Sequence, residues 1–569
     1  MQPLSIDDYP TLQQYINHND QQSSNTNFIA LFMWQGVDSI QFELHDHFLI
    51  LLYKNIRDQI FFAAPFCHLE YYQEAIDYMI SYANTHQFTF KICMAIESIT
   101  KDIKAIYHKQ FVYQRTPEND DYIYSRKSLE TLSGKKMQKK RNHYRAFIRD
   151  YPQYHYKEIE TLDIPHIKDR MIDWYNDEMD PILQHEYEGI LSLLKNRQYL
   201  SLMMGCIYIN HTVEAIIIGS MRNDNTLQIH VEKANKNIRG IFIAIEKLFL
   251  ENAPAHYLYV NREEDMGLAN LRKAKQSLHP IHMITKYKIT SRHIQIRIAK
   301  REDKDRIRQL WLACFSDETI ESTDYYFQYY YKEQYTYVLL QETTIVSALQ
   351  IVPFALEGNK TIYFIEGVCT DENYRNNGFM KELLEHVLQQ EPFASHTLYL
   401  QAYTPSIYYP FGFHDTYFLH KVIVDRTHYA SMTNCHTSTI SPELLLQLYK
   451  QYCESFHGYR LRSLAYYHNL KRRAKSLNEN IVGIYEGEQL LGYTQYQEDT
   501  DTITITEIIY LSALSLETMI SYFTATSDKK ITIYCDTKAT IYGTKERVCN
   551  MLTNNKERIN DTLFINEIY

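Results

Sequence analysis

The sequence lacks the features that mark exported, membrane-spanning and zinc-binding proteins. Its nine cysteines are scattered without a Cys-x-x-Cys pair, which argues for reduced thiols and against a zinc ribbon. No basic head followed by an apolar core stands at the N-terminus, so no secretory signal is expected. The longest apolar runs, such as Phe48–Tyr53, fall far short of the roughly 20 residues that a membrane helix needs. We therefore expect a cytoplasmic protein with no membrane span and no bound metal.

An excess of positive charge is also missing, because 69 acidic residues outnumber 59 lysines and arginines and give a formal net charge of −10. This balance sets a mild bias against nucleic acid, although a local basic patch can still bind it. Hydrophobic residues make up 45% of the chain, an ordinary fraction that can build real cores. At 569 residues the chain is too long for one such core, so several globular domains are expected.

Short β-rich runs alternate with segments of helical periodicity along the whole chain, which predicts α/β or α+β domains with mixed sheets. One boundary is expected near Thr290–Gln295, where a β-rich ending meets a polar stretch before a new strand. A second is expected within Arg426–Ser441, a polar stretch before Pro442 opens a helix. The predicted domains are residues 1–290, 296–428 and 440–569.

The middle domain carries the most informative pattern. A strand-like run, Thr361–Val368, leads through a polar loop to the hexapeptide 375–380 (RNNGFM), and an amphipathic helix follows. A helix start offers unpaired backbone N–H groups and the positive end of the helix dipole, which together bind anions such as a pyrophosphate. Gly378 would let the backbone approach that anion closely. Taken alone this loop is weak evidence, since many helices follow a glycine-containing turn.

A second motif lies downstream, where a β-like run, Thr397–Ala402, precedes the hexapeptide 408–413 (YYPFGF). Together the two motifs resemble the GNAT superfamily, whose coenzyme loop is written [RQ]-x-x-G-x-[GA] and whose last strands carry Y-x-x-F-G-F. Met380 departs from the general loop but fits the tandem-GNAT branch related to the enhanced-intracellular-survival acetyltransferases. The resemblance implies a bacterial transferase that moves an acetyl group from acetyl-CoA to a primary amine.

The resemblance also implies roles for the matched positions. Backbone groups of Val368 and Thr370 would hold the thioester and the pantetheine arm, and Tyr408 would protonate the departing thiolate. A phenol of pKa about 10 suffices for a thiolate leaving group of pKa roughly 8 to 9. The residues implied for the pyrophosphate are Arg375, Asn376, Asn377, Gly378, Phe379 and Met380.

Two more residues of the same strand bear on the mechanism. Glu366 is a candidate base for the attacking amine, and a hydrogen-bonded strand carboxylate is the alternative reading. Cys369 invites an acyl-cysteine, but alternation along a strand places it on the face opposite Val368 and Thr370, so a structural role is predicted. The acceptor is expected to be a small molecule or a peptide amine, whose identity the sequence does not give.

The C-terminal domain echoes a GNAT core without the coenzyme loop. No R-x-x-G follows the strand-like run Glu507–Tyr510, so no coenzyme is expected there. In the branch that the chain resembles, a second, degenerate GNAT domain packs on the first and the terminal carboxylate enters the active site. By that resemblance the carboxylate of Tyr569 is a further candidate base.

The N-terminal domain carries a set of motifs that is specific as a group. They are Asp121–Tyr124 (DYIY), Leu132–His143 (LSGKKMQKKRNH), His230–Ala234 (HVEKA) and Tyr259–Gly267 (YVNREEDMG). The set resembles a bacterial family related to the C-terminal domain of phosphatidylglycerol lysyltransferases, a fold of two GNAT-like halves. Relatives pass an aminoacyl group from tRNA to a lipid hydroxyl or a peptide amine. An aminoacyl-tRNA-dependent transferase, or a non-catalytic module that binds tRNA or peptide, is therefore the alternative function.

Two groups of N-terminal residues are candidate contacts for a substrate or tRNA. The basic run that begins at Lys135 can hold an RNA backbone by nonspecific charge, and a solvated helix face is the equal alternative. Arg262 and Asp265 lie in a loop that contains both positive and negative side chains. An ion-pair network that shapes a pocket and a direct catalytic role are the two alternative interpretations of this loop. The candidates in the basic run are Lys135, Lys136, Lys139, Lys140 and Arg141.

Overall fold

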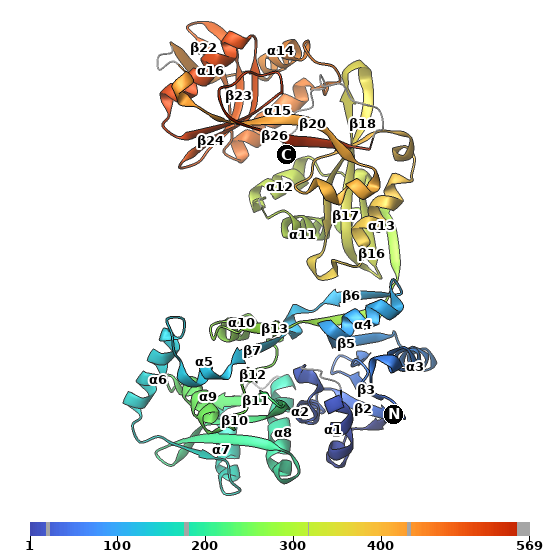
Figure 1. The fold of residues 1–569 in the computed structure, drawn as a ribbon, viewed down its shortest axis with the longest axis vertical. Helices are drawn as coiled ribbons and strands as arrows, with labels where there is room; N and C mark the ends of the chain where they lie inside the picture. The colour runs from blue at the N-terminus through green and yellow to red at the C-terminus, as the bar shows by residue number, and fades with distance from the viewer. Residues whose placement is uncertain (19–22, 176–180, 317, 430–433, 555–569) are drawn as a thin grey trace. The chain divides into compact units, whose positions relative to one another are not determined.

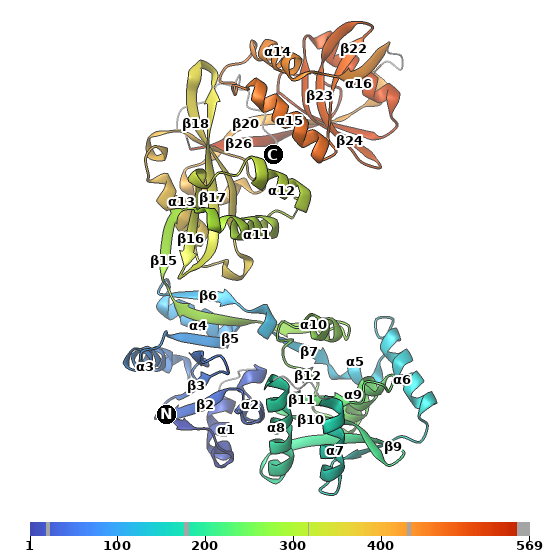
Figure 2. The same ribbon diagram turned by 180° about the vertical axis from the view of Figure 1, so that it is seen from behind.

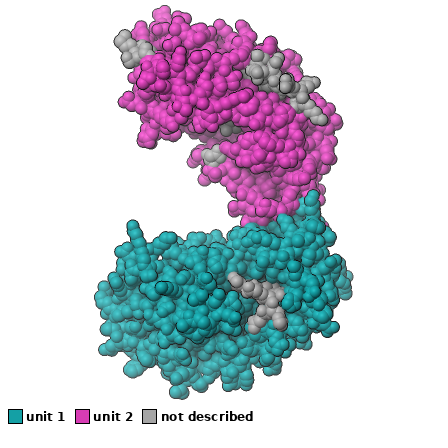
Figure 3. Space-filling model, in the orientation of Figure 1, with its two compact units in different colours: residues 1–292 teal, residues 293–569 magenta. Residues whose placement is uncertain are grey.

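The computed structural model describes residues 1–18, 23–175, 181–316, 318–429 and 434–554 (Figures 1 and 2). The chain forms two compact units, residues 1–292 and 293–569 (Figure 3). Both are mixed α/β structures, so the predicted fold class is confirmed. In the part of the chain that the structure describes, no helix combines the length and the apolar character that a membrane span requires.

Unit 1 is built on two seven-stranded sheets, in the orders β1-β2-β3-β4-β5-β14-β6 and β13-β7-β12-β11-β10-β9-β8. The strands of the first sheet are β1 (Gln2–Pro3), β2 (Ser39–Leu44), β3 (Leu49–Lys54), β4 (Ile60–Phe62), β5 (Lys91–Ile96), β6 (Phe111–Arg115) and β14 (Lys286–Ser291). Those of the second sheet are β7 (Asp121–Ser125), β8 (His155–Glu158), β9 (Leu202–Ile209), β10 (Thr212–Asn223), β11 (Thr226–Ala234), β12 (Tyr259–Asn261) and β13 (His282–Ile284).

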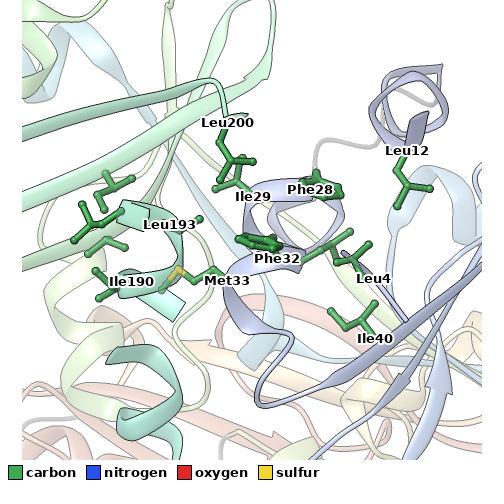
Figure 4. Close-up of a cluster of buried hydrophobic side chains, with 14 of the residues drawn as sticks. Leu4, Leu12, Phe28, Ile29, Phe32, Met33, Ile40, Ile190, Leu193 and Leu200 are labelled. Atoms are coloured by element: carbon green, nitrogen blue, oxygen red, sulfur yellow. The ribbon is translucent and has the colours of Figure 1, made fainter. Parts of the chain in front are cut away.

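The helices of unit 1 cover these sheets, and α2 (Phe28–Trp34) is buried between them over almost its whole length because its sequence is apolar on every side. Figure 4 shows Phe32 and Met33 of α2 facing Ile190 and Leu193 of α8 (Pro181–Asn196), with Leu4 and Ile40 on the other side. The remaining helices are α1 (Tyr9–His18), α3 (Tyr72–Thr85), α4 (Glu97–Tyr107), α5 (Arg126–Thr131), α6 (Gln138–Asp150), α7 (Asp163–Tyr175), α9 (Ile241–Asn252) and α10 (Ala269–Gln276).

Unit 2 contains one twelve-stranded sheet in the order β15-β16-β17-β18-β19-β26-β20-β25-β24-β23-β22-β21. The order reads the same from either end once β20 and β26 are exchanged, so unit 2 consists of two six-stranded halves that insert their last strands into each other. The first half has β15 (Ile294–Ile298), β16 (Thr336–Gln341), β17 (Thr344–Leu356), β18 (Lys360–Thr370), β19 (Leu398–Leu400) and β20 (His414–Val424). The second has β21 (Cys435–Thr439), β22 (Asn480–Glu486), β23 (Gln489–Glu498), β24 (Thr502–Tyr510), β25 (Lys530–Cys535) and β26 (Gly543–Thr553).

The polar stretch within Arg426–Ser441 therefore separates two halves of one sheet, and each half depends on the other for a neighbouring strand. Residues 420–423 of β20 pair with both β25 and β26, which explains why the two halves form one compact unit. The helices of unit 2 are α11 (Lys304–Cys314), α12 (Ile320–Tyr329), α13 (Phe379–Leu388), α14 (Pro442–Cys453), α15 (Leu464–Ser476) and α16 (Ala513–Thr526).

Candidate active site

The sheet of unit 2 opens between β18 and β19. Their parallel pairing ends at Ile365 and Leu400, whereas β18 runs on to Thr370. Among the described pairings, β19 offers no partner to β18 beyond Ile365. The backbone of Val368 and Thr370, implied by the resemblance to hold the thioester and pantetheine arm, lies along this opening.

A β-bulge shapes β18 at the same point. Ala348 pairs with Cys369 and Gln350 with Glu366, so β18 carries one residue more than β17 between these two pairs. Gly367 lies in the bulge with φ +62°, and a Cβ there would come within 2.2 Å of the Trp311 ring. Only glycine meets both conditions.

A cavity of about 750 Å³ lies in front of this opening, within the usual range for small-molecule sites. The two halves of unit 2 both contribute to its wall. From the first half come Trp311, Tyr326, Glu366, Val368 and Tyr408, and from the second come Arg460, Arg462, Tyr466 and Glu507.

Glu366 stands at the cavity wall, half-buried and hydrogen-bonded. The Tyr326 hydroxyl of α12 donates to its carboxylate, and the Trp311 ring stacks on Tyr326 at 4.6 Å between centroids. A donated hydrogen bond stabilises the charged form of a carboxylate. The arrangement suits a base that must be ionised before it takes a proton. The same contact also fits the alternative, in which Glu366 is a hydrogen-bonded carboxylate of the strand.

Tyr408 lies between the short 3-10 turns Pro405–Ile407 and Tyr409–Phe411, and its side chain lines the cavity. Burial raises the pKa of Tyr408 to about 12, with a further contribution from the nearby Cys369 thiol. The phenol therefore carries its proton through the neutral range. Its neighbour Tyr409 is exposed and donates to Asp415 at 3.1 Å, so the two adjacent tyrosines face different surroundings.

The loop 375–380 leads into α13 with Gly378 at the helix N-cap, φ +79°. A Cβ at Gly378 would meet no heavy atom within 4 Å, so the space before the helix is open. Glycine is favoured here because of the positive φ and not because of a close neighbour. Asn377 turns inward and donates to the Tyr374 carbonyl at 2.9 Å, and Phe379 is buried in the core. Of the residues expected at the pyrophosphate, the exposed ones are Arg375, Asn376 and Gly378, with Met380 half-buried.

Cys369 is 3% exposed and packs with Ala348 and Trp311 in a core cluster. Its partner is Cys314, a residue to which no sequence motif pointed, whose thiol donates to the Thr370 carbonyl at 3.4 Å. A hydrogen bond with Cys369 and the nearby Arg375 guanidinium lower the pKa of Cys314. This geometry does not support an acyl-cysteine, because Cys369 lies inside the core.

Tyr569, the other candidate base, lies outside the described residues.

Arg462 and Glu507 form a buried ion pair on the opposite wall of the cavity. The Arg462 guanidinium donates to the two carboxylate oxygens at 3.0 and 2.7 Å, and the Tyr493 hydroxyl donates to the same carboxylate at 2.7 Å. Sequence reasoning missed this pair, because the two residues lie far apart in the chain and carry no motif.

In unit 1 the charged loop after β12 is engaged in internal contacts. Arg262 pairs with Glu232 and with Glu246, the latter at 3.0 Å. Asp265 is 1% exposed and accepts from Arg272 at 2.7 and 2.9 Å and from Tyr122 at 2.7 Å. These contacts fit the ion-pair interpretation of the loop.

The basic run of unit 1 divides into inward and outward side chains. Lys140 donates to Ser277 at 2.7 Å, and Arg141 donates to the Gly134 carbonyl at 3.2 Å while also reaching Leu132. Lys135, Lys136 and Lys139 are exposed. The outward lysines are the ones with free access to a large anion.

A second polar network in unit 1 joins residues of three of the N-terminal motifs to Ser220 and Lys286, which no motif contained. Ser220 Oγ lies 2.8 Å from His230 Nε2, and His230 Nδ1 lies 3.1 Å from Glu263. Nearby, the Lys286 ammonium is 2.6 Å from Asp121, and both side chains are fully buried. The serine, histidine and glutamate are connected as in a hydrolase, but Ser220 is only 2% exposed and its hydroxyl is not accessible to a substrate.

Three relatives illustrate the comparisons with known proteins. An uncharacterized protein of Mycoplasmoides gallisepticum is 26% identical over 190 residues, 32% of this chain, and the chain spans 59% of that relative's length. A conserved protein of unknown function from Bacteroides thetaiotaomicron is 28% identical, with 51% of this chain and 98% of that one covered and a TM-score of 0.49. Eis1 from Mycobacterium abscessus is 11% identical, with 46% and 73% covered and a TM-score of 0.36.

Two protein families match the chain in succession and together span most of it. The family described as phosphatidylglycerol lysyltransferase, C-terminal, matches residues 17–290. The acetyltransferase (GNAT) domain family matches residues 295–415. Both resemblances predicted from the motifs are confirmed. The chain thus joins a region that matches the phosphatidylglycerol lysyltransferase C-terminal family to a region that matches the GNAT acetyltransferase domain family.

Proposed function

We propose that unit 2 transfers the acetyl group of acetyl-CoA to a primary amine bound in the cavity between its halves. The matches of both regions to families of acyl-transferring enzymes support an acyltransferase. The observation that carries the finer proposal is the opening of β18 from β19, at which Glu366, Val368 and Tyr408 line one cavity.

Each part of the site has a chemical task. When bound, acetyl-CoA supplies an acyl thioester, and the helix start at Gly378 with the Arg375 side chain suits its pyrophosphate. Glu366 takes a proton from the acceptor amine as the nitrogen forms its bond to the acyl carbon. Tyr408 gives its proton to the sulfur as the carbon–sulfur bond breaks, and it recovers a proton from solvent. No covalent enzyme intermediate is needed.

The full chain incubated with acetyl-CoA and a panel of primary amines tests this proposal. The panel holds a polyamine, an aminoglycoside and a lysine-containing peptide, and mass spectrometry detects a gain of one acetyl group. We expect acetylation of at least one class, with none by Arg375→Glu and normal acetylation by Arg301→Glu, an exposed arginine of the same unit. If the protein binds acetyl-CoA but acetylates none of these amines, the result contradicts the proposal.

A second candidate function belongs to unit 1, namely transfer of an aminoacyl group from tRNA. The match of residues 17–290 and the three outward lysines Lys135, Lys136 and Lys139 favour it. A tRNA shift assay with these lysines changed to glutamate tests it, and Lys140 and Arg141 stay unchanged because they hold the fold. Equal binding by the variant and the wild type would remove the RNA-binding role of this run.

A further inference from the structure

Three polar side chains form a row across the sheet of the first half of unit 2. Thr336 on β16 is directly opposite Gln350 on β17, and Gln350 is directly opposite Glu366 on β18. Directly opposed residues have Cβ atoms about 4.5–5.5 Å apart. The row therefore starts at the cavity wall with Glu366 and runs into the core.

The row lies on the face that α11 and α12 cover. Val338 and Ala348, two residues along β16 and β17 from Thr336 and Gln350, pack with Trp311 in one core cluster. Since alternate residues of a strand share a face, Gln350 lies beneath the same helices. Tyr326 of α12 donates to Glu366 from this side.

Gln350 is 2% exposed, and within the described part of the chain neither its Nε2 nor its Oε1 has a hydrogen-bond partner. Buried amides are almost always satisfied by protein groups or ordered water. Two more buried groups near the Tyr326–Glu366 contact share this state among the described residues, the Trp311 Nε1 and the Thr323 hydroxyl. Trp311 stacks on Tyr326, and Thr323 lies one turn before Tyr326 on α12.

The second half of unit 2 supplies an internal control. There Gln495 on β23 is directly opposite Glu507 on β24, the same pairing as Gln350 with Glu366. Gln495 donates to Glu479 at 3.1 Å, and Glu507 is paired with Arg462. The unsatisfied amide is thus a property of the half that carries the glycine loop, and the fold itself does not require it.

We propose that Gln350 holds ordered water beneath Glu366, and that this water donates to the carboxylate and positions it as the base. A buried water of this kind needs two to four polar groups as hydrogen-bond partners. Gln350 is then a positioning residue, which acts on the acceptor only through Glu366. The inference rests on the proposed function for the role of Glu366, but the water and its effect on the carboxylate do not depend on turnover.

The first test measures the ionisation of the Glu366 carboxylate as a function of pH. Infrared difference spectra between each protein and its Glu366→Gln variant report this ionisation. In Gln350→Leu the titration midpoint of the carboxylate should rise by about one pH unit, because one hydrogen bond to the charged form is lost. Gln350→His, which keeps a donor, should restore most of the wild-type midpoint. Gln495→Leu, the matched change in the second half, should leave it unchanged.

A high-resolution crystal structure of the full chain gives the second test. We expect a water molecule within hydrogen-bond distance of both Gln350 and Glu366. A dry site, or an unchanged midpoint in Gln350→Leu, would overturn the inference, and Gln350→Met serves if the leucine variant does not fold. Failure of the proposed acetylation looks different, because the water and the midpoint shift would remain without any acetylated product.

Discussion

The two halves of unit 2 have the same strand order and the same glutamine–glutamate pair, yet they treat the glutamate differently. Glu366 faces the cavity with a tyrosine hydroxyl as its donor, whereas Glu507 is locked by Arg462 and Tyr493. A buried ion pair pays a desolvation cost and holds its charges in place. The first half therefore keeps a carboxylate at the cavity wall beside a tyrosine hydroxyl, and the second keeps one held in an ion pair.

The connection after the glutamate strand differs as well. Residues Asp371–Gly378 link β18 to α13, whereas only Leu511 and Ser512 link β24 to α16. The longer link contains the left-handed Gly378 and the exposed Arg375, and the shorter one ends in Ser512, whose side chain caps the helix by accepting from the Ser515 N–H. One half thus has room for a large anion at its helix start, and in the other a side chain closes that position.

The largest effect is expected from a change of Glu366, the candidate base that distinguishes the first half from the second. Glu366→Gln should lower the acetylation rate by roughly 10²- to 10⁴-fold, the range for loss of general acid–base catalysis, with acetyl-CoA affinity kept. Rates from mass-spectrometric assays and affinities from calorimetry check both parts. A variant with normal turnover would show that another group takes the proton.

Breaking the ion pair of the second half should act on stability. Arg462→Ala should cost about 3–5 kcal/mol in the free energy of unfolding of unit 2, because it leaves Glu507 buried without its partner. Urea denaturation followed by tyrosine fluorescence measures the loss. The double variant Arg462→Met with Glu507→Leu should recover most of it, and if the single variant is as stable as the wild type, the pair does not hold this wall.

Removal of the phenol tests the acid. Tyr408→Phe should slow acetylation by roughly 10²-fold, while Tyr409→Phe should leave the rate unchanged because Tyr409 faces Asp415. The raised pKa of Tyr408, about 12, also means that wild-type activity should show no loss from its deprotonation up to about pH 10. Equal rates for the two variants would exclude the role assigned to Tyr408.

The smallest effect comes from two left-handed glycines, Gly378 at the start of α13 and Gly487 in the turn between β22 and β23. Gly378 has φ +79° and Gly487 has φ +57°, and a Cβ at either would meet open space. Alanine at each should cost about 1–2 kcal/mol of conformational energy. Only Gly378→Ala should weaken acetyl-CoA binding, by up to roughly tenfold, and equal affinities in calorimetry would mean that the loop does not contact the coenzyme.

Local patterns in the sequence were enough for the strand, loop and helix around Gly378, since these depend on neighbouring residues. Tyr408 lines the cavity, and its role stays a prediction that the family resemblance implied. The joined sheet was not predictable in this way, because β26 lies between β19 and β20 through pairs such as Leu400 with Leu552, far apart in the chain. Register decides which residue faces Glu366, so neither the bulge at Gly367 nor Gln350 had a local signal. Side-chain direction was also hidden, and it separates Lys140, which turns inward, from Lys139.

The stoichiometry of acetyl-CoA binding to the full chain tests the central contrast most directly. Isothermal titration should give one molecule of acetyl-CoA per chain, with binding lost in Arg375→Glu and kept in a variant of the second half such as Gly487→Ala. Two molecules per chain, or none for a folded wild-type protein, would contradict the account that one half of unit 2 binds the coenzyme and the other only completes the cavity.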